Sequence, residues 1–295
     1  VRYFDTSPWY GLGLSERRMG AFLDDRNRDE FVVSTKIDRL LKPDASFRKP
    51  LMWKDYPPFR YEYDYSAAGT RRSIEDSLQR LGLARLDIVF IHDLSPDNGD
   101  LGPDWTRPFE VAMQGAAKEL TRMREEGLIR AWGFGVNTVE PCLRALKESD
   151  PDIFLSATKY SLIDHEDDLL RLFPACEERG VSIVAGAPLN SGFLAGVDRY
   201  NYSTRIPEPI LAKREKLRAV ASRHGVDLRT AALQFCAAPK VVSAVIPGAR
   251  TAEQARQNAE SMTAAIPADF WAELKSEGLI HAEAPTPTPT PSESR

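Results

Sequence analysis

The sequence predicts an α/β fold in which short buried strands alternate with longer helices on a parallel sheet. β-branched apolar runs alternate along the chain with segments whose apolar residues recur every three or four positions. The strand segments are continuous apolar runs, which is typical of strands that helices cover. With 295 residues, 42% of them hydrophobic, the chain is long enough for one large core, so we expect one main domain.

Several predicted strands end in polar or otherwise unusual residues. The predicted strands span residues 1–5, 31–37, 86–92, 129–136, 153–159, 182–187 and 241–247. Lys36, His92, Asn137 and Gly248 lie at or just beyond carboxyl ends, where barrel enzymes place their sites. Periodicity alone fits a closed barrel and a doubly wound sheet equally well.

The predicted helices follow these strands. They span residues 15–25, 66–81, 109–126, 139–148, 167–179, 209–224, 228–237 and 251–262. Ser15 before Glu16, and Asp227 before Leu228, have the side chains expected of helix N-caps.

Three segments stand apart from the alternation of strands and helices. Residues 38–65 and 190–207 form long insertions rich in aromatic rings, and such loops usually shape a pocket or a lid. The repeated Pro-Thr of residues 282–295 cannot bury enough apolar surface to fold, so we expect a disordered tail after a domain of residues 1–281.

Composition excludes several classes of function. A net charge of −4 without a run of basic residues argues against a nucleic-acid partner. Cys142, Cys176 and Cys236 are widely spaced in apolar patterns, so we expect buried thiols in a reducing compartment, with neither disulfides nor a metal site. The sequence shows no membrane span or signal peptide, and a cytoplasmic location is expected.

Asp5, Tyr10, Lys36 and His92 together have the chemistry of a proton-transfer site. A free tyrosine has a pKa near 10, so near neutral pH it needs a neighbouring cation to act as an acid or base. Lys36 is able to supply that cation, and Asp5 is able to keep it charged and fixed. His92 is able to orient a carbonyl oxygen or pass a proton. Taken singly, each residue is more often structural; their combination favours catalysis.

Five stretches, in order, resemble the aldo-keto reductases, which are NAD(P)H-dependent (β/α)8-barrel enzymes. They are Asp5-Thr-Ser-Pro-Trp-Tyr10-Gly-Leu-Gly, Ser34-Thr-Lys36, Arg72-Ser-Ile-Glu-Asp-Ser-Leu-Gln-Arg-Leu-Gly82, Asp87-Ile-Val-Phe-Ile-His92 and Ile246-Pro-Gly-Ala-Arg250 with the residues up to Asn258. The resemblance implies that Tyr10 is the general acid/base, that Lys36 and Asp5 tune it, and that His92 orients the substrate oxygen. Nicotinamide would carry the hydride.

The resemblance also implies a set of cofactor-binding residues. These are Asn137, Pro188, Leu189, Asn190, Ser191, Gly192, Phe193, Gly248, Arg250, Gln254 and Asn258. NADP-selective members carry cations where this chain has Gly248 and Gln254, so NAD is favoured over NADP, although Arg250 still offers one phosphate contact. The family's stacking tyrosine corresponds to Gly186, which leaves Phe193 as a candidate to hold the nicotinamide ring.

Four further motifs are Tyr63-Asp-Tyr-Ser66, Ile91-His-Asp93, Gly133-Phe-Gly-Val-Asn137 and Pro188-Leu-Asn-Ser-Gly-Phe-Leu-Ala195. They resemble the family branch of L-fucose or D-threo-aldose 1-dehydrogenase and pyridoxal 4-dehydrogenase. This resemblance implies a small polar substrate, first an aldose such as L-fucose oxidised to a lactone and second pyridoxal. Trp9 and Trp53 either line the substrate pocket or pack the loop. The family's N-terminal hairpin, first strand and first helix have no counterpart before Asp5, so we expect a barrel lacking these elements.

Two alternatives remain open from the sequence. One is a non-catalytic, nucleotide-binding subunit that regulates a partner, as potassium-channel β-subunits partly are. The other is a truncated, inactive product. The sequence leaves the oligomeric state open.

Overall fold

The computed structural model describes residues 1–102 and 104–287, so residues 288–295 of the predicted tail lie outside it. The chain divides into two compact units, Val1–Leu155 and Ser156–Arg295. Among the described residues, no helix combines the length and apolar character needed to cross a membrane.

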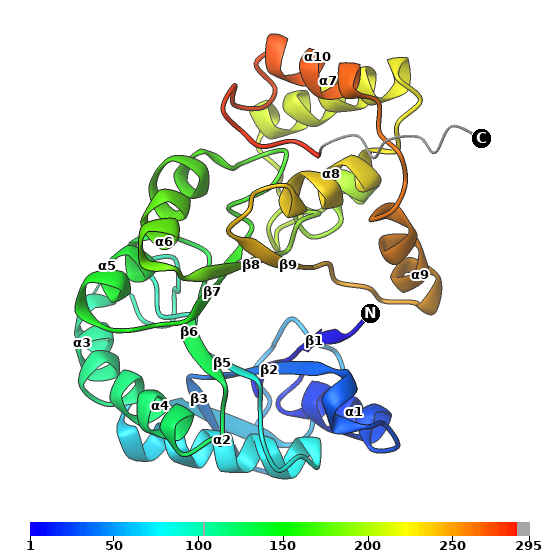
Figure 1. The fold of residues 1–295 in the computed structure, drawn as a ribbon. Helices are drawn as coiled ribbons and strands as arrows, with labels where there is room; N and C mark the ends of the chain where they lie inside the picture. Colours follow the sequence, from blue (N-terminus) through cyan, green and yellow to red (C-terminus); the bar gives the residue numbers. More distant parts are fainter. Residues whose placement is uncertain (103, 288–295) are drawn as a thin grey trace. The chain divides into compact units, whose positions relative to one another are not determined.

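The first unit is built on parallel strands that match the predicted ones closely. Its strands are β1 (Tyr3–Asp5), β2 (Val32–Ile37), β5 (Ile88–His92) and β6 (Ala131–Val136), paired in that order. Helices α1 (Leu14–Leu23), α2 (Ala67–Leu81), α3 (Thr106–Gln114), α4 (Ala116–Glu125) and α5 (Glu140–Glu148) lie along one side of these strands (Figure 1). Because the pairing is parallel, the carboxyl ends of β1, β2 and β5 lie at one edge.

The start of α1 differs from the prediction. Helix α1 begins at Leu14, after Gly13 with a φ of 82°, and has no side-chain cap. Ser15 therefore is not the N-cap; its Oγ instead accepts a hydrogen bond of 2.8 Å from Thr6 Oγ1. A left-handed turn at Gly11, Leu12 and Gly13 leads the chain into the helix.

The helix predicted over residues 109–126 is two helices, α3 and α4, which meet at Gly115. A Cβ at Gly115 would lie 2.8 Å from the backbone nitrogen of Ala67 and 2.9 Å from the carbonyl oxygen of Tyr65. The Ala116 N–H donates to that same Tyr65 oxygen at 3.1 Å. The chain thus breaks the helix where it packs against the start of α2.

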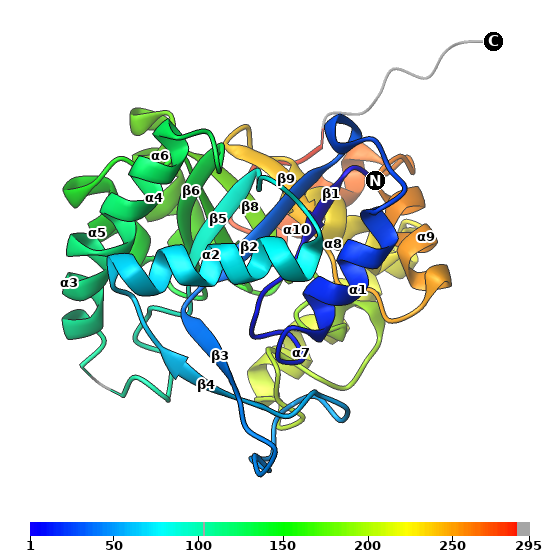
Figure 2. The same ribbon diagram turned by 90° about the horizontal axis from the view of Figure 1, so that it is seen from below.

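The insertion predicted as a loop over residues 38–65 contains an antiparallel hairpin. Its strands are β3 (Arg39–Pro43) and β4 (Phe59–Tyr63), with Arg39 opposite Tyr63. Figure 2 shows the hairpin extending away from the parallel strands of its unit. The alternation of rings and charges in Phe59-Arg-Tyr-Glu-Tyr63 is the period-two signal that would have found β4.

The second unit has its own strands and a core of rings and thiols. Strand β7 (Ile153–Ala157) runs through the point of division, and β8 (Ser182–Gly186) pairs in parallel with β9 (Val242–Ile246). The remaining elements are a π turn at Asp168–Leu172, α6 (Phe173–Arg179), η3 (Phe193–Ala195), α7 (Glu208–Arg223), α8 (Leu228–Ala237), α9 (Ala252–Ser261) and α10 (Ala268–Ser276).

In this unit one helix cap was predicted correctly and one helix was missed. Asp227 caps α8 as predicted, because its side chain accepts the Thr230 N–H. Helix α10 was not predicted, although Phe270, Trp271 and Leu274 give it a buried face.

The cysteines are buried thiols, as predicted. Burial raises the pKa of the Cys176 thiol to about 12 and also raises that of Cys236, so both thiols hold their protons at neutral pH.

Candidate active site

Asp5 and Lys36 form a buried ion pair at the carboxyl ends of β1 and β2. Lys36 Nζ donates to Asp5 Oδ2 at 2.6 Å and to the Thr6 carbonyl oxygen at 2.8 Å. The Lys36 side chain is 1% exposed and the Asp5 side chain 9%, so the protein holds this ammonium with little access to water. Ser34 Oγ donates to the other carboxylate oxygen, and Tyr3 donates to Ser34 at 2.9 Å. These bonds fix the carboxylate and, through it, the lysine.

Tyr10 lies beside both Lys36 and His92. The Lys36 ammonium is 4.9 Å from the centre of the Tyr10 ring, and the Tyr10 and His92 ring centres are 5.9 Å apart at an angle of 83°. The structure therefore brings together the four residues that the sequence singled out.

His92 is held neutral in a buried position. Burial lowers its pKa well below the usual 6.5, and the positive charges of Lys36 and Arg39 lower it further. The Tyr65 hydroxyl donates to the His92 carbonyl oxygen at 3.0 Å, which fixes the backbone at the end of β5. His92 Nδ1 lies 3.2 Å from Asp38 Oδ2, yet it makes no hydrogen bond with the described residues.

Arg39 is a residue of this site that the sequence analysis did not single out. Its guanidinium donates to Asp38, to Asp93 Oδ2 at 3.0 Å and to the Tyr63 hydroxyl at 2.5 Å. The guanidinium carbon lies 4.4 Å from the centre of the Trp9 ring and 4.5 Å from that of Tyr63. Arg39 thus connects the loop before Tyr10 with the segment after His92. The sequence analysis expected a loop here and not a hairpin, so it gave no sign that Arg39 pairs with Tyr63.

Asp38, His92 and Asp93 have ligand atoms within 4.8 Å of one another, as a metal site would. Arg39 donates hydrogen bonds to both carboxylates of this group. Its guanidinium already supplies the positive charge that a metal ion would bring, so the arrangement is explained by the ion pairs.

Trp9 and Trp53 pack against each other near the hairpin. Their ring centres are 4.6 Å apart at 81°, and Tyr61 meets Trp9 at 4.8 Å. Both tryptophans are half-buried, so each presents part of its ring to solvent. They form an aromatic wall on the first unit, and a role in substrate binding stays a prediction.

The loop of the second unit that holds the predicted cofactor residues Pro188 to Phe193 has an unusual backbone. Ala187, Asn190, Ser191 and Gly192 all have positive φ values, between 46° and 90°. The N–H groups of Asn190 and Gly192 donate within the loop, to the carbonyl oxygens of Ala187 at 2.9 Å and Leu189 at 3.0 Å, so this left-handed backbone is held by its own hydrogen bonds. Asn190 Oδ1 is buried without a hydrogen-bond partner among the described residues, so it is free to accept a hydrogen bond from a bound ligand.

The other predicted cofactor residues of this loop have partners within the second unit. Ser191 Oγ accepts the Tyr202 N–H at 2.9 Å. Phe193 is fully buried, with the Arg214 guanidinium 4.2 Å above its ring and Tyr200 at 5.4 Å. Pro188 and Leu189, which precede Phe193 in the same loop, are also buried.

The residues between β9 and α9 are mostly exposed. Gly248, Arg250 and Gln254 are exposed, and the Arg250 N–H donates to Gln254 Oε1 at 2.8 Å. Asn258 is buried one turn further along α9. In the first unit, Asn137 Nδ2 donates to Asp97 Oδ2 at 2.9 Å.

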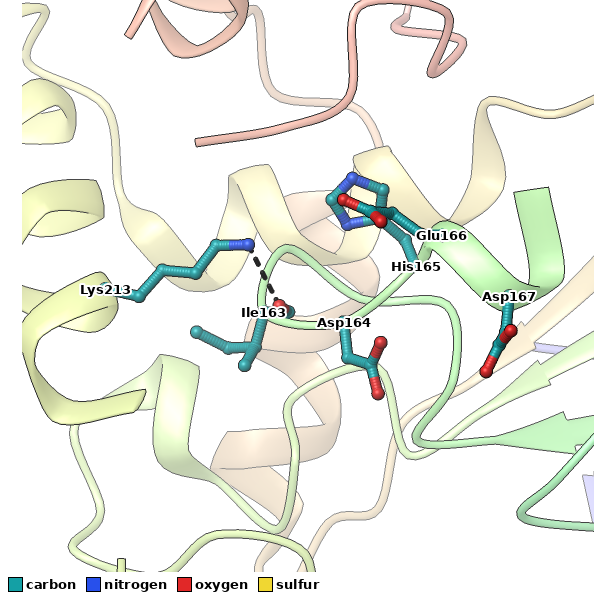
Figure 3. Close-up of a pocket in the computed structure, with 6 residues that line it drawn as sticks. All are labelled: Ile163, Asp164, His165, Glu166, Asp167 and Lys213. Carbon is teal, nitrogen blue, oxygen red and sulfur yellow. Dashed lines mark hydrogen bonds between the residues drawn. The ribbon is translucent and has the colours of Figure 1, made fainter. Parts of the chain in front are cut away.

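A separate pocket of about 240 Å³ lies in the second unit (Figure 3). It is lined by Ile163, Asp164, His165, Glu166, Asp167 and Lys213. Lys213 Nζ donates to the Ile163 carbonyl oxygen at 2.9 Å, and Asp164 pairs with Lys159 at 2.9 Å. None of the predicted site residues lines it, and these bonds give its charges a structural role.

A family model described as the aldo/keto reductase family matches residues 1–277. The chain belongs to the aldo/keto reductase family. It is 38% identical to D-threo-aldose 1-dehydrogenase of Pseudomonas sp over 95% of this chain and 84% of that protein. It is 34% identical to pyridoxal 4-dehydrogenase of Microbacterium luteolum over 95% of this chain and 85% of that protein.

Solved aldo-keto reductases have the same fold. The holo form of an aldo-keto reductase from Bacillus halodurans matches 96% of this chain and 83% of its own, with a TM-score of 0.70 at 23% identity. The glycerol dehydrogenase of Gluconobacter oxydans matches 99% of this chain and 84% of its own, with a TM-score of 0.68 at 21% identity. These matches show the aldo-keto reductase (β/α)8 fold that the sequence resemblance predicted.

Proposed function

We propose that this aldo-keto reductase is an NAD(P)-dependent dehydrogenase that oxidises a free aldose such as L-fucose to a lactone, with pyridoxal as the second candidate substrate. The observation that carries the proposal is the buried Lys36 ammonium, which binds Asp5 and lies 4.9 Å from the centre of the Tyr10 ring. Similarity to an aldose and a pyridoxal dehydrogenase supports the choice of substrates.

Tyr10 acts as the general acid/base in this proposal. During oxidation, the Tyr10 oxygen takes the proton of the reacting hydroxyl, and in reduction it returns that proton to the carbonyl oxygen. Lys36 stabilises the phenolate form, and Asp5 holds Lys36 charged and in place.

His92 orients the reacting oxygen. Because burial keeps its ring neutral, one ring nitrogen carries a proton to donate while the ring adds no positive charge. A neutral donor fixes the direction of the substrate oxygen and leaves the proton transfer to Tyr10.

Loop residues 188–193 and the segment from Gly248 to Asn258 would hold the dinucleotide. The unpartnered Asn190 Oδ1 is a hydrogen-bond acceptor, so it fits a donor of the dinucleotide such as a ribose hydroxyl or the carboxamide N–H. Nicotinamide, when bound, supplies the hydride acceptor or donor. Gly248 and Gln254 add no positive charge for a 2′-phosphate, which favours NAD, while Arg250 keeps NADP possible.

The test is a spectrophotometric assay of the purified protein with NAD and NADP, over L-fucose, other aldoses and pyridoxal. We expect reduced nucleotide to form fastest with NAD and an aldose. Nucleotide binding without turnover of any sugar or aldehyde would contradict the proposal and favour a regulatory subunit.

A further inference from the structure

Asp93 is a carboxylate next to His92 that proton transfer by Tyr10 does not use. Its backbone has a φ of 50°, in the left-handed region that is unusual for a residue other than glycine. The Asp93 N–H donates to the Gly135 carbonyl oxygen at 3.0 Å, and its own carbonyl oxygen accepts from Asn98 Nδ2 at 2.8 Å. These two bonds hold the strained backbone and so fix the direction of the side chain.

The two carboxylate oxygens of Asp93 have different neighbours. Oδ2 accepts from Arg39 at 3.0 Å, whereas Oδ1 lies 3.3 Å from His92 Nε2. The Asp93 side chain is 26% exposed, compared with 8% for His92 and 0% for Asp38. Of this acidic pair beside His92, Asp93 is therefore the one that a substrate reaches from solvent.

Arg39 makes this carboxylate rigid. Its guanidinium contacts the rings of both Trp9 and Tyr63 and also binds Asp38, so it has little freedom to follow a moving partner. Burial raises the pKa of Asp93 above its usual range, and the positive charge of Arg39 opposes that rise. An acceptor held in this way needs little reorganisation to bind a donor.

We propose that Asp93 is a specificity-determining residue, which accepts a hydrogen bond from the hydroxyl on the carbon next to the reacting carbon of a sugar. The inference rests on the proposed function and deepens it. Neighbouring oxygens on a sugar are separated by roughly the length of one hydrogen bond, about 3 Å. Oδ1 and His92 Nε2 are 3.3 Å apart, so they match two adjacent oxygens, the reacting one at His92 and the next one at Asp93. A carboxylate accepts only, so it selects a hydroxyl at that place.

The test compares L-fucose with 2-deoxy-L-fucose in the wild type and in Asp93→Asn, with NAD in excess. Asparagine keeps the size of the side chain and an acceptor for Arg39, but it loses the negative charge. We expect the ratio of kcat/KM for L-fucose over the deoxy sugar to fall roughly tenfold to a hundredfold, the effect of losing one charge-assisted hydrogen bond. Asp76→Asn in α2, where the carboxylate likewise accepts from an arginine, Arg72, is the matched control and should leave the ratio unchanged.

Two outcomes would overturn the inference. If Asp93→Asn kept the wild-type ratio, the carboxylate would not be binding the hydroxyl next to the reacting carbon. An equal loss with both sugars, in a variant whose thermal unfolding matches the wild type, would assign Asp93 a general positioning role. Failure of the wild type to oxidise either sugar would instead overturn the proposed function, and the inference with it.

Discussion

At the scale of single residues, the site depends on an ion pair that little solvent reaches. Lys36 and Asp5 are 1% and 9% exposed and 2.6 Å apart. Breaking such a pair from one side leaves an uncompensated charge in a poorly solvated place, which costs about 3–5 kcal/mol.

Lys36→Met should therefore lose both stability and turnover. We expect the free energy of unfolding, measured by denaturant titration, to fall by about 3 kcal/mol or more. The double variant Asp5→Leu/Lys36→Met removes both charges and should regain much of that stability while remaining inactive. Full turnover by Lys36→Met would remove the lysine from the mechanism.

His92 gives the stability a pH dependence of known sign. Its pKa is lowered in the folded protein, so on acidification the unfolded chain takes up the proton first, near pH 6.5. The contribution of His92 is fully present above pH 6.5 and is lost as the pH falls below it, by at most about 1.4 kcal/mol per pH unit.

The measurement is denaturant unfolding at pH 7.5 and pH 5.0, in the wild type and in His92→Gln. The wild type should lose more stability between the two conditions than the variant does. The difference isolates His92, because other buried groups such as His165 are common to both proteins. Equal losses would mean that the folded protein does not hold this ring neutral.

The sequence singled out the four residues that the structure brings together, because each follows or closes a strand within a recognisable motif. Arg39 was missed for a physical reason: its role depends on contacts with Trp9, Tyr63 and Asp93, which are distant in sequence. Asp93 was hidden in the same way, since its significance comes from its distance to His92 Nε2 and from its Arg39 contact.

At the scale of elements, strand β6 depends on a glycine with no room for a side chain. A Cβ on Gly133 would lie 1.7 Å from the carbonyl oxygen of Ile153. That atom belongs to the backbone of β7, so the contact can be relieved only by moving a strand.

Gly133→Ala should accordingly destabilise the protein severely, by several kcal/mol, and lower the yield of folded material. Gly99→Ala is the matched control, because a Cβ there meets no atom within 4 Å. Circular dichroism melting compares the two. A Gly133→Ala protein with the same melting temperature as the wild type would contradict the close packing of β6 against β7.

The elements that the sequence misplaced share a cause. Gly115 interrupts a helix whose apolar pattern is continuous, because the start of α2 lies close to its backbone. Ser15 is not the N-cap, because α1 begins one residue earlier, after the left-handed Gly13. Both outcomes depend on contacts with residues outside the local segment. Periodicity and capping preferences describe only the local segment, so they do not predict such contacts. Asp227, whose capping is local, was predicted correctly.

At the scale of the whole molecule, the repeated strand and helix signals were enough to predict an α/β fold on a parallel sheet. Parallel pairing brings the ends of β1, β2 and β5 to one edge, and this is why Asp5, Lys36 and His92, far apart in sequence, belong to one site. Periodicity did not distinguish a barrel from an open sheet, because both bury their strands under helices. The family motifs made that choice, and the solved relatives confirm it.

The central claim is that Tyr10, beside Lys36 and His92, is the group that exchanges the substrate proton. Its most direct test is the single-turnover rate of Tyr10→Phe with NAD and L-fucose, with nucleotide binding measured by fluorescence in the same preparation. Phenylalanine keeps the ring and removes only the hydroxyl. The account predicts a loss of at least about a hundredfold in the rate, with nucleotide affinity little changed. A Tyr10→Phe protein that oxidises the sugar at the wild-type rate would contradict it.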